Sequence, residues 1–139
     1  MSQTTIKSFF KSPYFAVVGA TPDPNKYGHK VFAWYLSHSL PVTGINPRTP
    51  TVLTHETLAS LKDLENPKGT SVSFITPPQV TRTTLEVAAE IGIPAVWFQP
   101  GAYDEECVGF AKENGMVVIA GGKCVLVDGG VGVEARGKL

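Results

Sequence analysis

Phosphate-binding chemistry is indicated first by the segment from Gly19 to Gly28, which follows an apolar run. Gly19 lets the backbone approach a ligand closely, while Thr21 supplies a hydroxyl and Lys26 a positive charge. A helix that starts at Gly28 would add free N–H groups and a positive dipole end, which attract anions. The segment therefore predicts an anion site, most naturally for a diphosphate. Because it matches neither the dinucleotide-binding glycine motif nor the P-loop, a plain strand-to-helix turn with a solvated lysine is the alternative.

A second segment, Asn46-Pro47-Arg48, bears on which nucleotide would bind. Dinucleotide sites usually place Asp or Glu after the second strand, where the carboxylate holds the ribose hydroxyls. The arginine found here instead favours an additional phosphate, such as the ribose phosphate of NADP or of coenzyme A. The alternative is an ordinary surface arginine after a turn.

A third segment, Thr76-Pro77-Pro78, places two prolines directly after a buried strand. Proline is tolerated in the first turn of a helix, so a helix can begin here. The same rigid backbone could form a wall against an adenine ring or a pantetheine arm. We expect these residues to serve both purposes.

The elements that must position these segments alternate between apolar strands and amphipathic helices. Strands are expected over Tyr14–Ala20, Val42–Ile45, Val72–Thr76, Ala95–Phe98 and Met116–Ile119, with shorter ones near Val52 and over Cys124–Val127. Helices are expected over about 28–38, 77–91 and 104–114, and a helical turn over Leu58, Leu61 and Leu64. This alternation predicts an α/β fold, a doubly wound, Rossmann-like parallel sheet of about five strands with helices on both faces, in a single domain. Ligands bind such sheets at the carboxyl ends of the strands, where the three segments would meet.

Composition and charge narrow the class of partner. The chain has 139 residues, of which 42% are hydrophobic and 17% charged, as expected of one globular domain. Lys and Arg total 12, as do Asp and Glu, so no net field favours nucleic acid. No apolar run is long enough to cross a bilayer, and two widely spaced cysteines suit a reducing compartment. We expect a cytoplasmic protein that contacts neither nucleic acid nor membrane.

The two ends of the chain have less regular patterns than its centre. Residues 1–127 form the predicted nucleotide-binding domain, in which 1–11 is an N-terminal arm or a short helix. Residues 128–139 form a glycine-rich tail with no clear period. We expect this tail to be mobile, or to be held only by a partner or a neighbouring subunit.

The sequence predicts neither a catalytic set nor a metal site. His29, His38 and His55 have no spacing typical of metal ligands. Cys107 is expected to pack against the sheet. Cys124 could attack a thioester if its pKa were lowered, but a buried structural cysteine is the commoner case.

Four groups of residues, taken in order, form a wider pattern. They are Val17-Val18-Gly19-Ala20-Thr21 with Lys26-Tyr27-Gly28, Ile45-Asn46-Pro47-Arg48, Ile75-Thr76-Pro77-Pro78 and Trp97-Phe98-Gln99-Pro100-Gly101. Their order and spacing over about residues 11–127 resemble the CoA-binding protein family related to the amino-terminal domain of the succinyl-CoA synthetase alpha subunit.

This resemblance implies a place for each group around coenzyme A. The residues it puts at the phosphates are Gly19, Ala20, Thr21 and Lys26, followed by Tyr27 and Gly28. Those near the ribose phosphate, or the chain beyond it, are Asn46, Pro47 and Arg48. Those that would line the nucleotide or pantetheine are Thr76, Pro77 and Pro78, with Gln99 and Gly101 on the same rim.

The resemblance also implies a function, a small coenzyme A-binding protein without evident catalysis of its own. Ligase activity does not follow, since the ligase needs a second domain with a phosphorylated histidine and a partner subunit. Two other classes stay open. One is an enzyme, either an NADP- or NAD-dependent oxidoreductase or an acyl-CoA enzyme using Cys124. The other is a nucleotide-responsive interaction module, acting as a homo-oligomer or with a protein partner.

Overall fold

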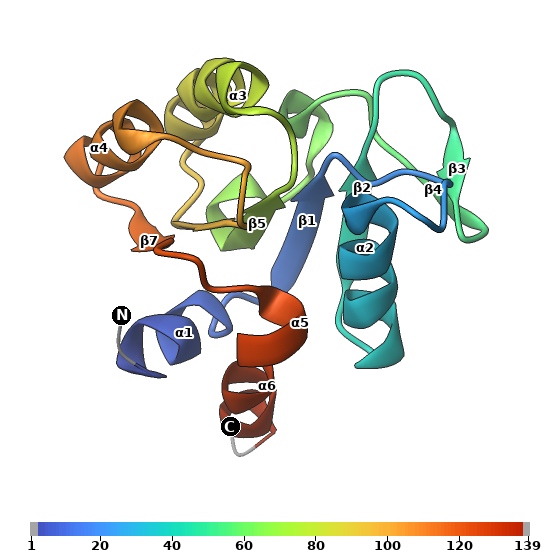
Figure 1. The fold of residues 1–139 in the computed structure, drawn as a ribbon, viewed down its shortest axis with the longest axis horizontal. Helices are drawn as coiled ribbons and strands as arrows, with labels where there is room; N and C mark the ends of the chain where they lie inside the picture. Colours follow the sequence, from blue (N-terminus) through green and yellow to red (C-terminus); the bar gives the residue numbers. More distant parts are fainter. Residues whose placement is uncertain (1–2, 138–139) are drawn as a thin grey trace.

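The computed structural model describes residues 3–137, and its centre is a parallel sheet of five strands (Figure 1). The strands lie in the order β2-β1-β5-β6-β7. Their bounds are Val42–Ile45 for β2, Tyr14–Val18 for β1, Thr70–Phe74 for β5, Ala95–Phe98 for β6 and Val117–Ile119 for β7. Because the chain runs outward from β1 in both directions, the strand order reverses between β1 and β5. The doubly wound fold class is therefore confirmed.

The helices within residues 3–137 cover both faces of this sheet. They are α1 (Gln3–Phe9), α2 (Tyr27–Ser37), α3 (Pro78–Ile91), α4 (Glu105–Glu113), α5 (Val125–Asp128) and α6 (Gly130–Arg136). Helices α3 and α4 lie on one side, and α1, α5 and α6 lie on the other (Figure 1). In this part of the chain, no helix has both the length and the apolar character needed to span a membrane.

The segment between β2 and β5 contains only short elements. They are the hairpin strands β3 (Thr51–Val52) and β4 (His55–Glu56), and the 3₁₀ turns η1 (Leu61–Asp63) and η2 (Pro67–Gly69). The predicted helical turn over residues 58–64 is thus confined to η1. Leu58 instead lies beside β2, where its N–H donates to the Gly44 carbonyl.

Two strands have bounds that differ by two residues from their apolar runs. β1 stops at Val18 because Gly19 adopts a φ of +101°, outside the range of strand residues. β5 begins at Thr70 rather than Val72 and ends at Phe74. Its first two residues are polar yet buried, and the Ser71 hydroxyl donates to the Phe9 carbonyl at 2.6 Å. A search for apolar residues alone misses this start.

The starts and ends of α3 and α4 agree with their local sequence signals. α3 has Pro78 in its first turn and ends before Gly92, which adopts a φ of +86°. The Asp104 carboxylate caps α4 by accepting from the Cys107 N–H at 3.0 Å. These hydrogen bonds hold the Asp104 pKa below its usual value.

Two hydrophobic clusters fill the spaces on either side of the sheet. Phe74, Phe98 and Leu85 belong to the cluster under α3 and α4. Phe15 and Trp97 belong to the cluster under α1, α2, α5 and α6, and Trp97 is fully buried as a core residue. Each fully buried apolar side chain contributes roughly 1.5–3 kcal/mol of transfer free energy. The strands are therefore held from both faces, which gives their carboxyl ends a rigid base.

The prediction of a strand over Cys124–Val127 is wrong. These residues lead into α5, and the N–H groups of Val127 and Asp128 donate to the Cys124 carbonyl at 3.0 and 2.7 Å. Val125 is fully buried whereas Val127 is 81% exposed. In a strand these two side chains would face the same side, so the burial pattern requires a helix. A run of four apolar residues carries no periodicity that distinguishes the two structures.

The expectation of an irregular glycine-rich tail held only by a partner is also wrong for residues 130–136. α6 packs on α1, and the Arg136 guanidinium donates to the carbonyls of Phe10 and Ser12 at 3.1 and 2.7 Å. A Cβ added to Gly132 would clash with the Phe10 ring. Glycine serves here for close packing rather than for flexibility, a role that composition alone does not distinguish. Residues 138 and 139 lie outside the described part.

Candidate functional site

The loops after β1 and β5 lie against each other at the carboxyl edge of the sheet. A Cβ added to Gly19 would lie 3.4 Å from the Thr76 Cγ2 and from the Thr76 backbone nitrogen. The positive φ of Gly19 turns the chain sharply out of β1 at this point. The structure therefore brings the first and third predicted segments together at the reversal of strand order.

The start of α2 presents backbone N–H groups that no side chain caps. Lys26 occupies the cap position without a side-chain hydrogen bond, and the first turn holds no acidic residue. A Cβ added to Gly28 would clash with the Gly19 carbonyl oxygen, so only glycine lets the helix start so close to the loop. The donors at this helix end suit an anion.

Asn46 ties the second segment to the first. Its Nδ2 donates to the Ala20 carbonyl at 2.8 Å, and its Oδ1 accepts from the N–H groups of Arg48 and Thr49 at 2.8 and 3.1 Å. The Asn46 side chain is thus engaged within the protein, and the Ala20 side chain is buried. The Arg48 side chain is exposed beside a shallow depression of about 220 Å³ that Asn46 and Pro47 also line.

The double proline joins the loop after β5 to α3 and α4. Pro77 precedes α3, and the Pro78 carbonyl accepts from the Cys107 thiol at 3.6 Å. The Thr76 hydroxyl bonds to the Thr81 hydroxyl at 2.8 Å. Pro77 is exposed and Pro78 is half-buried, so this rigid wall faces outward only in part.

Gln99 has a completely buried side chain. Among the predicted site residues within 3–137, it alone has a buried polar side-chain atom without a hydrogen-bond partner. Its Oε1 accepts from the Val125 N–H at 3.0 Å and from the Tyr27 hydroxyl at 3.4 Å. Its Nε2 has no partner in this part of the chain. Gly101 follows in the same loop, where a Cβ would meet no atom within 4 Å.

Cys124 joins this group through Tyr27, which sequence reasoning did not anticipate. The Tyr27 hydroxyl forms a hydrogen bond with the Cys124 Sγ. Burial raises the Tyr27 pKa, and the bond to Cys124 adds to this effect, so the phenol stays protonated at neutral pH. Cys124 is only partly buried. The distance of 97 residues between these partners explains why no local signal revealed the contact.

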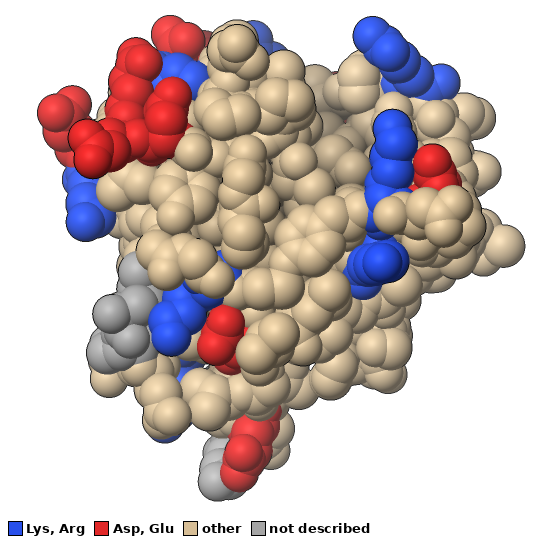
Figure 2. All heavy atoms as spheres, viewed as in Figure 1, with Lys and Arg blue, Asp and Glu red and all other residues tan. Residues whose placement is uncertain are grey.

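The charges near the start of α2 are mainly positive. Lys26, Lys30 and Arg48 are exposed. Figure 2 shows basic side chains over the region of α2, whereas acidic side chains gather over α4 at the upper left. The carboxylate of Asp23 in the first loop accepts from the Asn25 N–H at 3.0 Å. The local field therefore favours an anionic ligand although the whole chain has no net charge.

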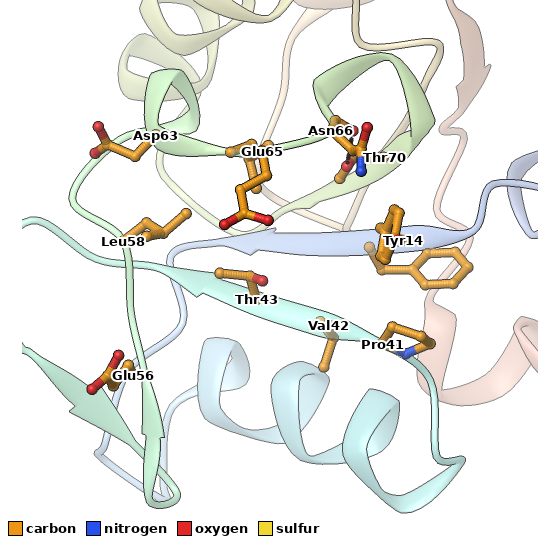
Figure 3. Close-up of a pocket in the computed structure, with 12 residues that line it drawn as sticks. Tyr14, Pro41, Val42, Thr43, Glu56, Leu58, Asp63, Glu65, Asn66 and Thr70 are labelled. Atoms are coloured by element: carbon orange, nitrogen blue, oxygen red, sulfur yellow. Dashed lines mark hydrogen bonds between the residues drawn. The ribbon is translucent and has the colours of Figure 1, made fainter.

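A larger cavity lies elsewhere, beside the edge strand β2 and near the starts of β1 and β5 (Figure 3). It has a volume of about 460 Å³. Glu56, Asp63 and Glu65 line it together with Tyr14, and its described lining includes no Lys or Arg. A phosphate ligand would be repelled here, so volume and charge indicate different places.

The chain belongs to the CoA binding domain family, whose model matches residues 14–130. It is 28% identical over 119 residues to the uncharacterized protein YneT of Bacillus subtilis (strain 168), covering 85% of this chain and 87% of that protein.

Solved structures agree with this assignment. A hypothetical protein from Pyrococcus horikoshii OT3 matches with a TM-score of 0.81 and 26% identity, over 100% of this chain and 92% of that chain. A conserved hypothetical protein from Pyrococcus furiosus matches with a TM-score of 0.77 and 32% identity, over 83% of this chain and 97% of that chain. The predicted family and the Rossmann-like architecture are thus confirmed.

Proposed function

We propose that this protein binds coenzyme A at the carboxyl edge of its sheet, with the diphosphate at the start of α2. The observation that carries the proposal is the uncapped helix start, closed against Gly19 by Gly28, in a member of the CoA binding domain family. Backbone N–H groups at such a start supply donors to a phosphate, and Lys26 adds a positive charge beside them.

The ribose phosphate of the ligand is assigned to Arg48. The Asn46 side chain accepts from the Arg48 N–H and donates to the loop after β1. Arg48 therefore projects from a loop of defined conformation. A guanidinium pairs with a phosphate through two parallel hydrogen bonds, which a lysine cannot reproduce.

The pantetheine arm is assigned to the rim formed by Thr76-Pro77-Pro78 and Gln99. The unpartnered Gln99 Nε2 is a donor suited to an amide carbonyl of that arm. Coenzyme A carries acyl groups as thioesters on its terminal thiol. In this proposal the chain's own residues bind and orient the ligand, and no catalytic step is assigned to them.

Calorimetric titration with coenzyme A, dephospho-coenzyme A, NADP and NAD tests the proposal. We expect saturable binding of coenzyme A, with dephospho-coenzyme A weaker by about 10- to 100-fold, as for one lost charged hydrogen-bonding group. Arg48→Ala should abolish the difference between these two ligands, whereas Lys26→Ala should weaken both. Lys62→Ala, which removes an exposed lysine from η1, is the matched control.

Two results would contradict the proposal. Binding of NADP or NAD without coenzyme A would move the protein to hydride chemistry, because NADP presents the same two phosphate groups to the same loops. Equal affinity for coenzyme A and dephospho-coenzyme A in the unmodified protein would remove the role assigned to Arg48.

A further inference from the structure

Three side chains from distant parts of the chain meet beside the proposed coenzyme A site. Tyr27 is the first residue of α2, Gln99 follows β6, and Cys124 precedes α5. The Tyr27 hydroxyl contacts both the Cys124 Sγ and the Gln99 Oε1. We propose that Cys124 is a covalent modification site that exchanges with the disulfide of a pantetheine-type thiol, and this inference rests on the proposed coenzyme A binding.

The two cysteines differ in what their surroundings permit. Cys107 is fully buried, its thiol faces the Pro78 carbonyl, and burial raises its pKa. Cys124 is partly exposed, and its Sγ forms a hydrogen bond with the Tyr27 hydroxyl, in which either group can be the donor. Because a thiol must be accessible in order to react, the partial exposure of Cys124 favours it over the buried Cys107.

Gln99 indicates what kind of thiol would be recognised. The Val125 N–H donates to the Gln99 Oε1, which fixes the orientation of the amide and leaves Nε2 as the free donor. A buried donor without a partner costs free energy, so a ligand acceptor at this place would relieve it. In pantetheine the thiol is followed by two methylene groups and an amide, whose carbonyl is such an acceptor.

The exchange needs only the Cys124 thiol and the ligand disulfide. The Cys124 thiolate attacks one sulfur of the ligand disulfide, the new Sγ–S bond forms, and the ligand S–S bond breaks. The other half of the ligand disulfide leaves as a thiolate and takes up the proton that Cys124 released. The disulfide is the oxidant, and the free thiol is its reduced product.

The test compares pantethine, the disulfide of pantetheine, with cystamine, which has the same sulfur end but no carbonyl. For each disulfide, the rate of adduct formation on the folded, reduced protein is measured by mass spectrometry. It is then divided by the rate at which the same disulfide reacts with the free thiol N-acetylcysteine. We expect one adduct, mapped to Cys124, absent in Cys124→Ser and retained in Cys107→Ser. The normalised rate should favour pantethine by about threefold to tenfold, as for a single hydrogen bond.

Gln99→Leu should reduce this preference to about one, and the cystamine rate in the same variant controls for changes in folding or thiol reactivity. An adduct on Cys107, no adduct, or a preference that persists in Gln99→Leu would overturn the inference.

Coenzyme A titration of Cys124→Ser separates the two proposals. If coenzyme A binds but pantethine forms no adduct, only the modification site is wrong. If the adduct forms but coenzyme A does not bind, only the proposed function is wrong.

Discussion

The two ends of the sheet differ in a way that volume alone would misjudge. At the amino-terminal ends of β1, β2 and β5, the chain leaves a cavity of about 460 Å³ lined by three carboxylates (Figure 3). At the carboxyl ends it leaves a shallow depression of about 220 Å³. There lie the uncapped start of α2, Arg48 and the Gln99 Nε2, which has no partner among residues 3–137. Hydrogen-bond donors and positive charge, rather than empty space, therefore indicate where an anion would bind.

Among these substitutions, Gly28→Ala is expected to have the largest effect on the carboxyl edge of the sheet. The added Cβ would clash with the Gly19 carbonyl, so the loop must move away from α2. We expect a loss of about 3 kcal/mol of unfolding free energy, at the upper end for overpacking, and loss of detectable coenzyme A binding. Denaturant unfolding and calorimetry measure the two effects. Gly109→Ala in α4, where a Cβ meets nothing within 4 Å, is the control and should be neutral or stabilising.

Gly132→Ala separates stability from binding. The Cβ would clash with the Phe10 ring between α6 and α1, so we expect a loss of about 1–3 kcal/mol of unfolding free energy. Coenzyme A affinity should stay within about twofold at temperatures where the variant is folded, since no residue of the proposed phosphate site is touched. Gly130→Ala, also in α6 but in open space, should not destabilise the protein. Equal losses in the two variants would contradict the packing role of Gly132.

Alkaline unfolding probes α2 beneath the site. Tyr35 is fully buried, and burial raises its pKa well above 10, despite its bond to the Ser73 hydroxyl. The unfolded chain therefore ionises first, so the stability present below pH 10 falls as pH rises, by about 1.4 kcal/mol per pH unit for this group. Denaturant unfolding between pH 8 and 12 should show a shallower fall in Tyr35→Phe. An identical slope would contradict the burial of this hydroxyl.

The smallest effect is expected in the acidic cavity. Glu65→Gln removes one of the carboxylates that line this cavity. Coenzyme A affinity should nevertheless change by less than about twofold, because solvent and salt screen an exposed charge at the amino-terminal edge of the sheet from the carboxyl edge. Calorimetry of this variant beside Arg48→Ala sharpens the comparison. A gain or loss of tenfold in Glu65→Gln would place the ligand in the cavity instead.

Much of the scaffold could be predicted from local patterns. The bounds of β2 and β6 match their predictions, and α3 ends at Ile91, the predicted end of that helix. The errors fall where a pattern is too short or has two meanings. The apolar run Cys124–Val127, which contains the start of α5, resembled a strand. Two closely packed glycines, Gly129 before α6 against Trp34 and Gly132 within α6 against Phe10, resembled a flexible tail.

Some of the predicted site residues lie close together in the structure, and others do not. Gly19, Gly28 and Thr76 lie side by side at the carboxyl edge. Asn46 has a structural role between the loops, since its side chain bonds to the backbone of Ala20, Arg48 and Thr49. Gly101 lines open space.

The sequence by itself determined the alternation of strands and helices and the glycine-bounded turn before α2, because hydrophobic period and backbone freedom are local properties. Only the tertiary structure decided that Tyr27 meets Gln99, 72 residues away, and Cys124, 97 residues away. Such contacts depend on how the crossovers place one loop above another. The same packing buried the Gln99 amide and left its Nε2 without a partner in the described part of the chain, which no sequence pattern encodes.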